Sequence, residues 1–237
     1  MKMKSASYVA ILLLVCVSAH AGWRIEGETK YKPPESVTGQ AASRVLDLEA
    51  SRDTVWMATV SYISQTSFAI DQISKDSGLV SIKFSEADPR RVIDCGILDL
   101  WVSNLRGRRT YTVEGAQPQA LFEEYAKGKI LGVERSVALT GVINIFVISI
   151  DQTHTSVRLN VRYVVAKRNV IHDVAAEMLG NVPPTVLTSS IAFNSGEVGS
   201  DDGGSATKCA SRFVLERQLL EGIALELSKI SGTSPLK

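Results

Sequence analysis

Two neighbouring stretches, GVINIFVISI at residues 141–150 and SVRLNVRYVV at residues 156–165, decide the fold. The first is an almost continuous apolar run, which is typical of a strand covered on both faces. The second alternates between apolar and polar residues, with the period of two that a half-buried strand requires. The apolar positions are Val157, Leu159, Val161 and Tyr163, and the polar ones are Arg158, Asn160 and Arg162. With a loop at residues 152–155 between them, the two stretches predict an antiparallel hairpin.

The chain before this hairpin predicts a strand, a helix and a second hairpin. Residues 45–50 alternate as a strand, and Ser51 is a suitable N-cap for the helix that follows it. Residues 68–73 and 79–84 then bracket a turn at Gly78, which can adopt a positive φ because it has no side chain. Further strands are expected at residues 92–95, 97–102 and 110–113, and a short helix at 119–127.

The C-terminal part predicts a last strand, a mobile loop and a long amphipathic helix. The strand is expected at residues 186–193 and the flexible Gly/Ser/Asp-rich loop at residues 195–207. From Arg212 onward, apolar residues recur at helical spacing on one face. That face comprises Phe213, Leu220, Ile223, Leu227 and Ile230, whereas Glu216, Arg217, Glu221 and Glu226 occupy the others.

Together these elements predict an α+β fold. A curved antiparallel sheet is expected to pack against an N-terminal helix and a long C-terminal helix, which is a helix-grip-like layout. The sequence predicts a single domain over residues 44–232. Residues 22–43 contain Pro33-Pro34 and show no sustained period, so we expect an exposed leader there.

The first 21 residues have the zones of a cleavable signal peptide. Lys2 and Lys4 form a cationic tip, and residues 8–17 are apolar but too short to span a bilayer. The residues Ala19-His20-Ala21 predict cleavage after Ala21 and export to the periplasm. Lipid anchoring through Cys16 is the less favoured alternative, because Val15 stands where lipoprotein processing prefers a small residue.

Charge and cysteine content narrow the classes of function. Removal of the signal peptide takes away two lysines and no acid, so the formal net charge changes from +1 to −1, which argues against a nucleic-acid partner. Cys95 and Cys209 are the two cysteines that remain, and an oxidising compartment favours a disulfide between them. The cysteines lack the neighbours that a metal site or a reactive thiol requires.

No catalytic motif appears in the chain, so we expect a protein that is not an enzyme and has no cofactor or metal. Nucleophile-elbow, zinc-protease, Walker and dinucleotide-binding patterns are absent. His154 falls in a predicted loop, and His172 beside Asp173 does not by itself establish a catalytic triad. Trp56 and Trp101 fit either a packed core or the lining of a ligand cavity.

One local cluster has the composition of an interaction patch. It consists of Arg106, Arg108, Arg109 and Tyr111. Guanidinium groups bind phosphates and carboxylates, and they also occur on the solvated turns between strands. Both interpretations remain open at this stage.

Several short segments resemble BamC-like periplasmic lipoprotein domains of the helix-grip type. These are DTVW at residues 53–56, FAID at 68–71, SGLV at 77–80, DCG at 94–96, and the cysteine-led helix of residues 209–220. The resemblance covers residues 46–230 and implies a helix with a tryptophan ahead of a hairpin, and a closing C-terminal helix. The chain departs from that family in having one such domain and no lipobox of the usual form.

These observations lead to two expectations about function. The first is an exported, non-enzymatic envelope protein that contacts an envelope protein partner, in outer-membrane or cell-envelope assembly. The second is a carrier that binds a hydrophobic small molecule or lipid in a helix-grip cavity. The sequence leaves membrane association open.

Overall fold

The structure is a computed structural model that describes residues 25–35, 44–173, 175–176, 180, 182–201 and 207–232. The predicted signal peptide at residues 1–21, with Cys16, lies outside the described residues. Two elements of the described chain determine its architecture. They are the neighbouring strands β9 (Lys129–Ser149) and β10 (Thr155–Asp173).

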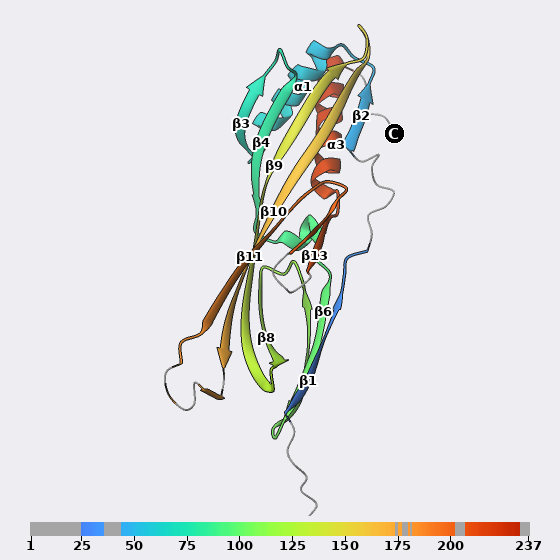
Figure 1. The fold of residues 1–237 in the computed structure, drawn as a ribbon. Coiled ribbons are helices and arrows are strands. Elements are labelled where there is room, and N and C mark those ends of the chain that lie inside the picture. The colour runs from blue at the N-terminus through green and yellow to red at the C-terminus, as the bar shows by residue number, and fades with distance from the viewer. Residues whose placement is uncertain are drawn as a thin grey trace, which may run out of the picture.

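The β9–β10 hairpin runs almost the full length of an elongated molecule (Figure 1). It is paired without a register shift from Ser149 opposite Thr155 to Leu131 opposite Asp173. The predicted strands at residues 142–150 and 157–163 are the half of this hairpin next to its turn. Both strands continue well beyond the predicted region, so the hairpin joins two halves of the molecule.

In the half with the helices, the sheet order is β3-β4-β9-β10-β2. The flanking strands are β2 (Val45–Leu48), β3 (Ala69–Ser74) and β4 (Leu79–Glu86). Helices α1 (Arg52–Ser64) and α3 (Val214–Ser231) lie together on one side of this sheet (Figure 1). The two helices approach closely at Gly222, where a Cβ atom would lie 2.0 Å from the ring of Tyr62. The predicted cap is confirmed, because the Ser51 side chain accepts a hydrogen bond from the Thr54 amide.

In the other half, two layers of strands face each other. Strand β8 (Gln119–Ala126) pairs with β9, and β11 (Thr185–Asn194) pairs with β10. The second layer is a sheet of β1 (Glu26–Lys32), β6 (Ile97–Asn104) and β7 (Gly107–Glu114). A separate small core fills the space between the layers and consists of Leu98, Leu100, Val113, Ala120, Phe122 and Val133.

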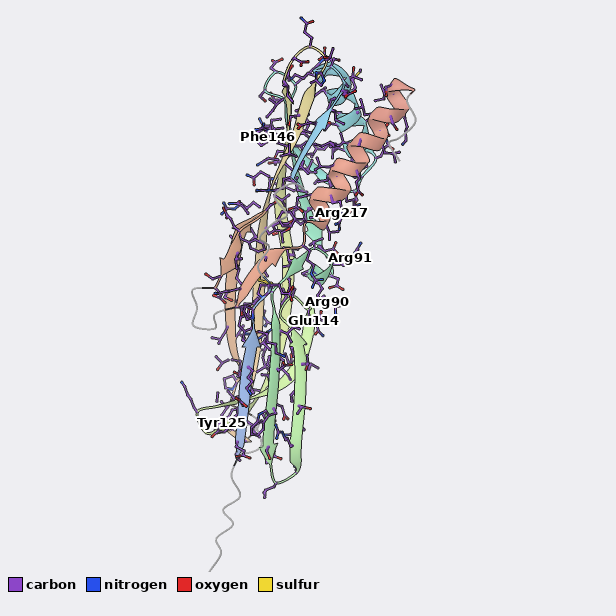
Figure 2. All side chains as sticks on the ribbon, turned by 90° about the vertical axis from the view of Figure 1, so that its right-hand side faces the viewer. Arg90, Arg91, Glu114, Tyr125, Phe146 and Arg217 are labelled. Carbon is purple, nitrogen blue, oxygen red and sulfur yellow. A yellow bond between two sulfur atoms is a disulfide. The ribbon has the colours of Figure 1, made fainter. Side chains whose placement is uncertain are left out.

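The region where the two halves meet is held by a short sheet and a disulfide. Strands β5 (Ile93–Asp94), β12 (Val198–Ser200) and β13 (Lys208–Ser211) form the sheet, next to a 3-10 turn, η2 (Pro89–Arg91). The predicted disulfide between Cys95 and Cys209 is confirmed, and it joins positions 114 residues apart. Arg90 lies 3.5 Å from Glu114 here, and Figure 2 shows the two residues midway along the molecule.

The expected helix-grip fold is wrong. The described chain is mostly β, with several antiparallel sheets, two α-helices and no long N-terminal helix. Residues 119–126 of the predicted helix at 119–127 form strand β8 instead, because pairing with β9 outweighs their helical composition. The region expected as an exposed leader contains β1, which pairs with β6. The region expected as a loop at residues 195–207 contains β12, and its residues 202–206 lie outside the described residues.

Candidate functional site

The predicted arginine cluster lies on and beside β7, where its members take different roles. Arg106 is in the turn before the strand, and its amide donates to the Asn104 side chain. The Arg108 guanidinium stacks 4.0 Å above the ring of Trp101. The Arg109 guanidinium forms an ion pair of 2.7 Å with Glu123 of β8. Successive residues of a strand point to opposite faces, so Arg108 and Arg109 do not share one surface.

Tyr111 lies on the same side of β7 as Arg109, at the edge of the small core. It lines an open pocket of about 400 Å³ together with Glu123, Glu134 and His172. Burial of the ring raises the pKa of the Tyr111 hydroxyl, and the neighbouring Glu123 carboxylate adds to this increase. The structure therefore brings together Tyr111 and His172, which are far apart in the sequence.

This pocket lies on a larger surface, which we call the four-strand face. The register places its residues in three rows across β8, β9, β10 and β11. The rows are Glu123, Gly132 and His172; Leu121, Glu134, Val170 and Val186; and Gln119, Ser136, Arg168 and Thr188. Directly paired residues point to the same side of a sheet, and the small core occupies the other side. The four-strand face is consequently the uncovered side of this sheet, although Val170 in its middle row is only 9% exposed.

Exposed apolar side chains lie between charged side chains on the four-strand face. Leu121 is 75% exposed and Val186 is 48% exposed, although both are aliphatic. Leu121 and Glu134 line both the 400 Å³ pocket and a neighbouring pocket of about 650 Å³, which also includes Arg168. An apolar residue between hollows and within a polar border is the arrangement found in protein–protein interfaces.

The pocket around His172 does not contain the groups of a hydrolytic triad. His172 lies 3.5 Å from the Glu134 carboxylate, which would suit a base and its orienting acid. However, the described residues that line this pocket include no serine, threonine or cysteine. Asp173, which follows His172 in the sequence, pairs with Lys129 at 2.7 Å. His172 and Asp173 therefore do not act as a pair.

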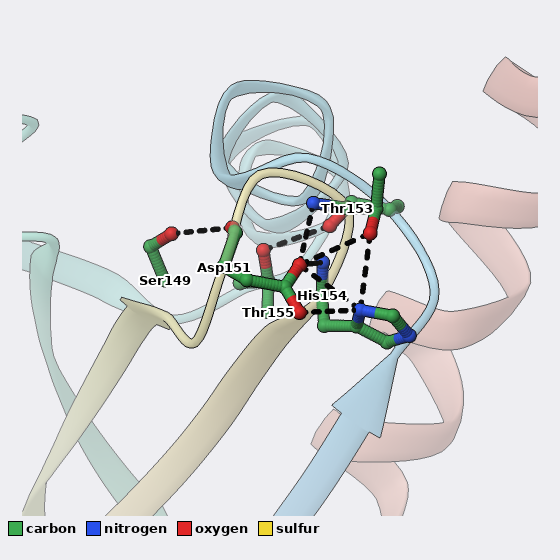
Figure 3. Close-up of polar contacts among 6 residues, drawn as sticks. Ser149, Asp151, Thr153, His154 and Thr155 are labelled. Carbon is green, nitrogen blue, oxygen red and sulfur yellow. Dashed lines mark hydrogen bonds and ion pairs between the residues drawn. The ribbon is translucent and has the colours of Figure 1, made fainter.

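His154 forms part of a compact turn at the far end of the β9–β10 hairpin (Figure 3). The Asp151 carboxylate accepts hydrogen bonds from the Thr153 and His154 amides at 2.7 and 2.8 Å. The His154 ring lies 2.8 Å from the same carboxylate. The Thr153 amide and the His154 ring are the main causes that lower the pKa of Asp151 to about 2. These contacts identify a turn-stabilising carboxylate.

A buried polar cluster at the start of α3 was missed by the sequence analysis. Glu216, which helical spacing placed on a polar face, is fully buried. One of its carboxylate oxygens accepts hydrogen bonds from Ser195 at 2.6 Å, Tyr163 at 2.9 Å and Ser211 at 3.3 Å. Phe213 begins the helix in the left-handed conformation, with φ of 55°. Burial and the Glu216 charge raise the pKa of Tyr163.

A buried ion pair between β10 and the end of β12 was also missed. The Lys167 ammonium lies 2.9 Å from the Asp201 carboxylate, and both side chains are almost fully buried. Lys167 also donates to the Thr207 hydroxyl, and Ser189 donates to Asp201. A lysine and an aspartate 34 residues apart carry no local pattern that would predict this pairing.

The described pockets give no enclosed apolar chamber. The pocket beside the disulfide has a volume of about 320 Å³ and is lined by Lys32, Arg90, Asp94, Glu114 and Arg212, among others. Trp56 lines none of the described pockets but is buried in the larger core beneath the helices.

Within the described residues, no group of three His, Cys, Asp or Glu side chains is placed to hold a metal ion. Neither described α-helix combines the length and apolar character needed to cross a membrane.

Comparison of the chain with protein-family models, curated proteins and solved structures found no match. The resemblance to BamC-like domains thus stays a prediction that rests on short segments. The disulfide is compatible with an oxidising location outside the cytoplasm.

Proposed function

We propose that the protein is an exported, non-enzymatic component of the cell envelope that acts by binding a protein partner through the four-strand face. The observation that supports this most directly is Leu121, a largely exposed leucine between two hollows on an uncovered sheet. Burial of such a side chain in an interface is worth about 1.5–3 kcal/mol, which is enough to make it a binding anchor.

The charges of the four-strand face indicate the chemistry of the partner. Glu134 and Arg168 carry opposite charges and lie in adjacent rows, on β9 and β10 respectively. A partner surface with one apolar group for the hollow beside Leu121, and with acidic and basic groups on its two sides, would match this pattern. Charges of both signs also make a uniformly anionic surface a poor fit.

The alternative function, transport of a hydrophobic molecule, receives less support from the geometry. A carrier would enclose its ligand in a largely apolar cavity. The described pockets are open and have charged residues in their walls. The space between the helices and the sheet is filled by side chains such as Trp56, Ile143 and Leu219.

Site-specific cross-linking in intact cells tests the proposed function. A photoreactive residue in place of Leu121 should give a discrete protein adduct, which mass spectrometry would identify. The matched control places the same residue at Met57, which is apolar and 53% exposed on α1, far from the four-strand face. Absence of an adduct at position 121, or the same adducts at both positions, would contradict the proposal. Recovery of lipid without protein would favour the carrier.

A further inference from the structure

Strand β11 differs from the other edges of the described sheets. Its sequence, TVLTSSIAFN, contains no charged residue over ten positions. The other described edge strands longer than three residues each carry at least one charge. Proteins protect exposed strand edges with charges, prolines and bulges, because a bare edge pairs readily with another strand. The edge of β3, for example, has a register irregularity and Asp71.

The first half of β11 is accessible for pairing. The residues at positions 185–188 are all exposed, and β10 is the one strand that pairs with them in the described chain. Val186 and Leu187 point to opposite faces, and Leu187 is 52% exposed. Farther along β11, the face of the strand is covered by β12, where Gly199 packs on Ile191 and Phe193. The accessible edge thus begins after Pro184 and extends for about six residues.

We infer that this edge pairs with the same edge of a second copy of the chain, giving an antiparallel dimer with a continuous sheet across both copies. A second copy has the same length of bare edge, and no like charges meet when the two edges approach. Threonine and valine at positions 185, 186 and 188 are well suited to strand pairing. Because the edge has no charged residue, a charged strand of another protein would gain no electrostatic attraction from pairing with it.

The sequence also favours one register for the dimer. Pairing centred on Leu187 places Leu187 opposite its copy and Thr185 opposite Ser189 of the second copy. This register brings the two largest exposed apolar side chains of the edge into contact on one face. The ladder then ends at Pro184, which has no amide hydrogen to donate. The four-strand face of each copy would continue into that of the other.

Sedimentation equilibrium of the purified full chain tests this inference. The wild-type protein should have twice the mass of a single chain, and Leu187→Lys should reduce the mass to that of one chain because a charge now faces its copy. Leu105→Lys is the matched control, because Leu105 is 68% exposed in the β6–β7 turn, away from β11. This variant should keep the mass of the wild type. Circular dichroism of each variant checks that the fold is retained.

A covalent test addresses the register. Leu187→Cys should form a disulfide-linked dimer on mild oxidation, and peptide mapping should show position 187 joined to position 187. A wild-type protein that sediments as a single chain, or a Leu187→Lys variant that keeps the doubled mass, would overturn the inference. The Leu121 cross-links do not depend on either result, so the proposed partner and the dimer can fail independently.

Discussion

Glu216 shows how a single residue can have a structural role that its sequence context conceals. Three hydroxyl groups, from Tyr163, Ser195 and Ser211, donate to one of its carboxylate oxygens within a fully buried site. These donors come from β10, the end of β11 and β13, so the carboxylate connects α3 to two sheets. A buried acceptor shared by several donors is expensive to remove, because the Tyr163 hydroxyl then loses its acceptor. Ser195 and Ser211 lose their bonds to Glu216 and keep those to the Val161 carbonyl and the Tyr163 hydroxyl.

We predict that Glu216→Ala destabilises the protein, by about 1–3 kcal/mol for each donor left unsatisfied. Glu216→Gln should have a smaller effect, since its side-chain carbonyl can still accept the hydrogen bonds. The free energy of unfolding in urea provides the measurement. Glu221→Ala on the exposed side of the same helix is the control and should have little effect. Equal losses for Glu216→Ala and Glu221→Ala would contradict the assigned role.

The raised pKa of Tyr163 predicts a dependence of stability on alkaline pH. Burial and the charge of Glu216 both favour the neutral phenol in the folded protein. Above pH 10, the ordinary pKa of tyrosine, the unfolded chain loses this proton while the folded protein retains it. The contribution of Tyr163 to stability is thus complete below pH 10 and decreases as the pH rises.

Urea unfolding at neutral and alkaline pH measures this effect. Tyr163→Phe should be less stable at neutral pH, because the hydroxyl bonds are lost, but it should show a shallower decrease above pH 10. Identical alkaline slopes for the wild type and the variant would show that Tyr163 ionises normally.

At the scale of elements, two hairpin turns show when a glycine is required by its surroundings. Gly78 has φ of +69°, and a Cβ atom there would lie 2.4 Å from the Val147 carbonyl oxygen. The amide of Val147 also donates to the Gly78 carbonyl, so the turn is fastened directly to β9. Gly128 has φ of +80°, but a Cβ atom there would meet nothing within 4 Å.

Alanine at the two positions should therefore give different losses of stability. Gly128→Ala should lose about 1–2 kcal/mol from the left-handed backbone conformation alone. Gly78→Ala should lose more, because the β3–β4 turn must also move away from β9. Thermal unfolding of the two variants under the same conditions compares them. A Gly128→Ala variant as unstable as Gly78→Ala would show that contact with Val147 does not matter.

The sequence predicts some of these elements well because their patterns are local. The N-cap at Ser51, the turn at Gly78 and the disulfide all follow from short motifs or from composition. Strand β8 does not, since Gln119–Ala126 is rich in helix-forming residues and becomes a strand through its pairing with β9. The second half of the β9–β10 hairpin was missed because Arg135 and Lys167 occupy inward positions and interrupt the apolar alternation.

At the scale of the whole molecule, strand β9 contributes to both cores, and β10 pairs with it along its whole length. Ile143 of β9 is buried in the core beneath the helices, and Val133 of the same strand is buried in the small core. Because β9 and β10 run through the sheets of both halves, unfolding of these strands in one half would also disrupt the sheet of the other. The four-strand face could not be predicted from sequence, because its rows depend on the pairing of β8 and β11 at a distance.

We predict that the two halves unfold in a single cooperative transition. Phe122→Ala in the small core and Ile143→Ala in the large core should each reduce the free energy of unfolding by about 2–5 kcal/mol and lower the midpoint temperature. In both variants the two halves should still unfold together. Scanning calorimetry should give equal calorimetric and van't Hoff enthalpies for the wild type and both variants. A second transition that appears with Phe122→Ala would indicate two independent domains.

The connectivity also determines when folding can begin as the chain is synthesised. Strand β2, near the start of the described chain, has no strand to pair with until Thr155–Arg158 of β10 have been made. Cys95 must wait still longer for Cys209, and α3 is the last element to emerge. Contacts between such distant positions form slowly, since a long loop has to close first. A ribosome-bound chain would thus expose unpaired strands for most of its synthesis, and its dependence on holding chaperones should be correspondingly strong.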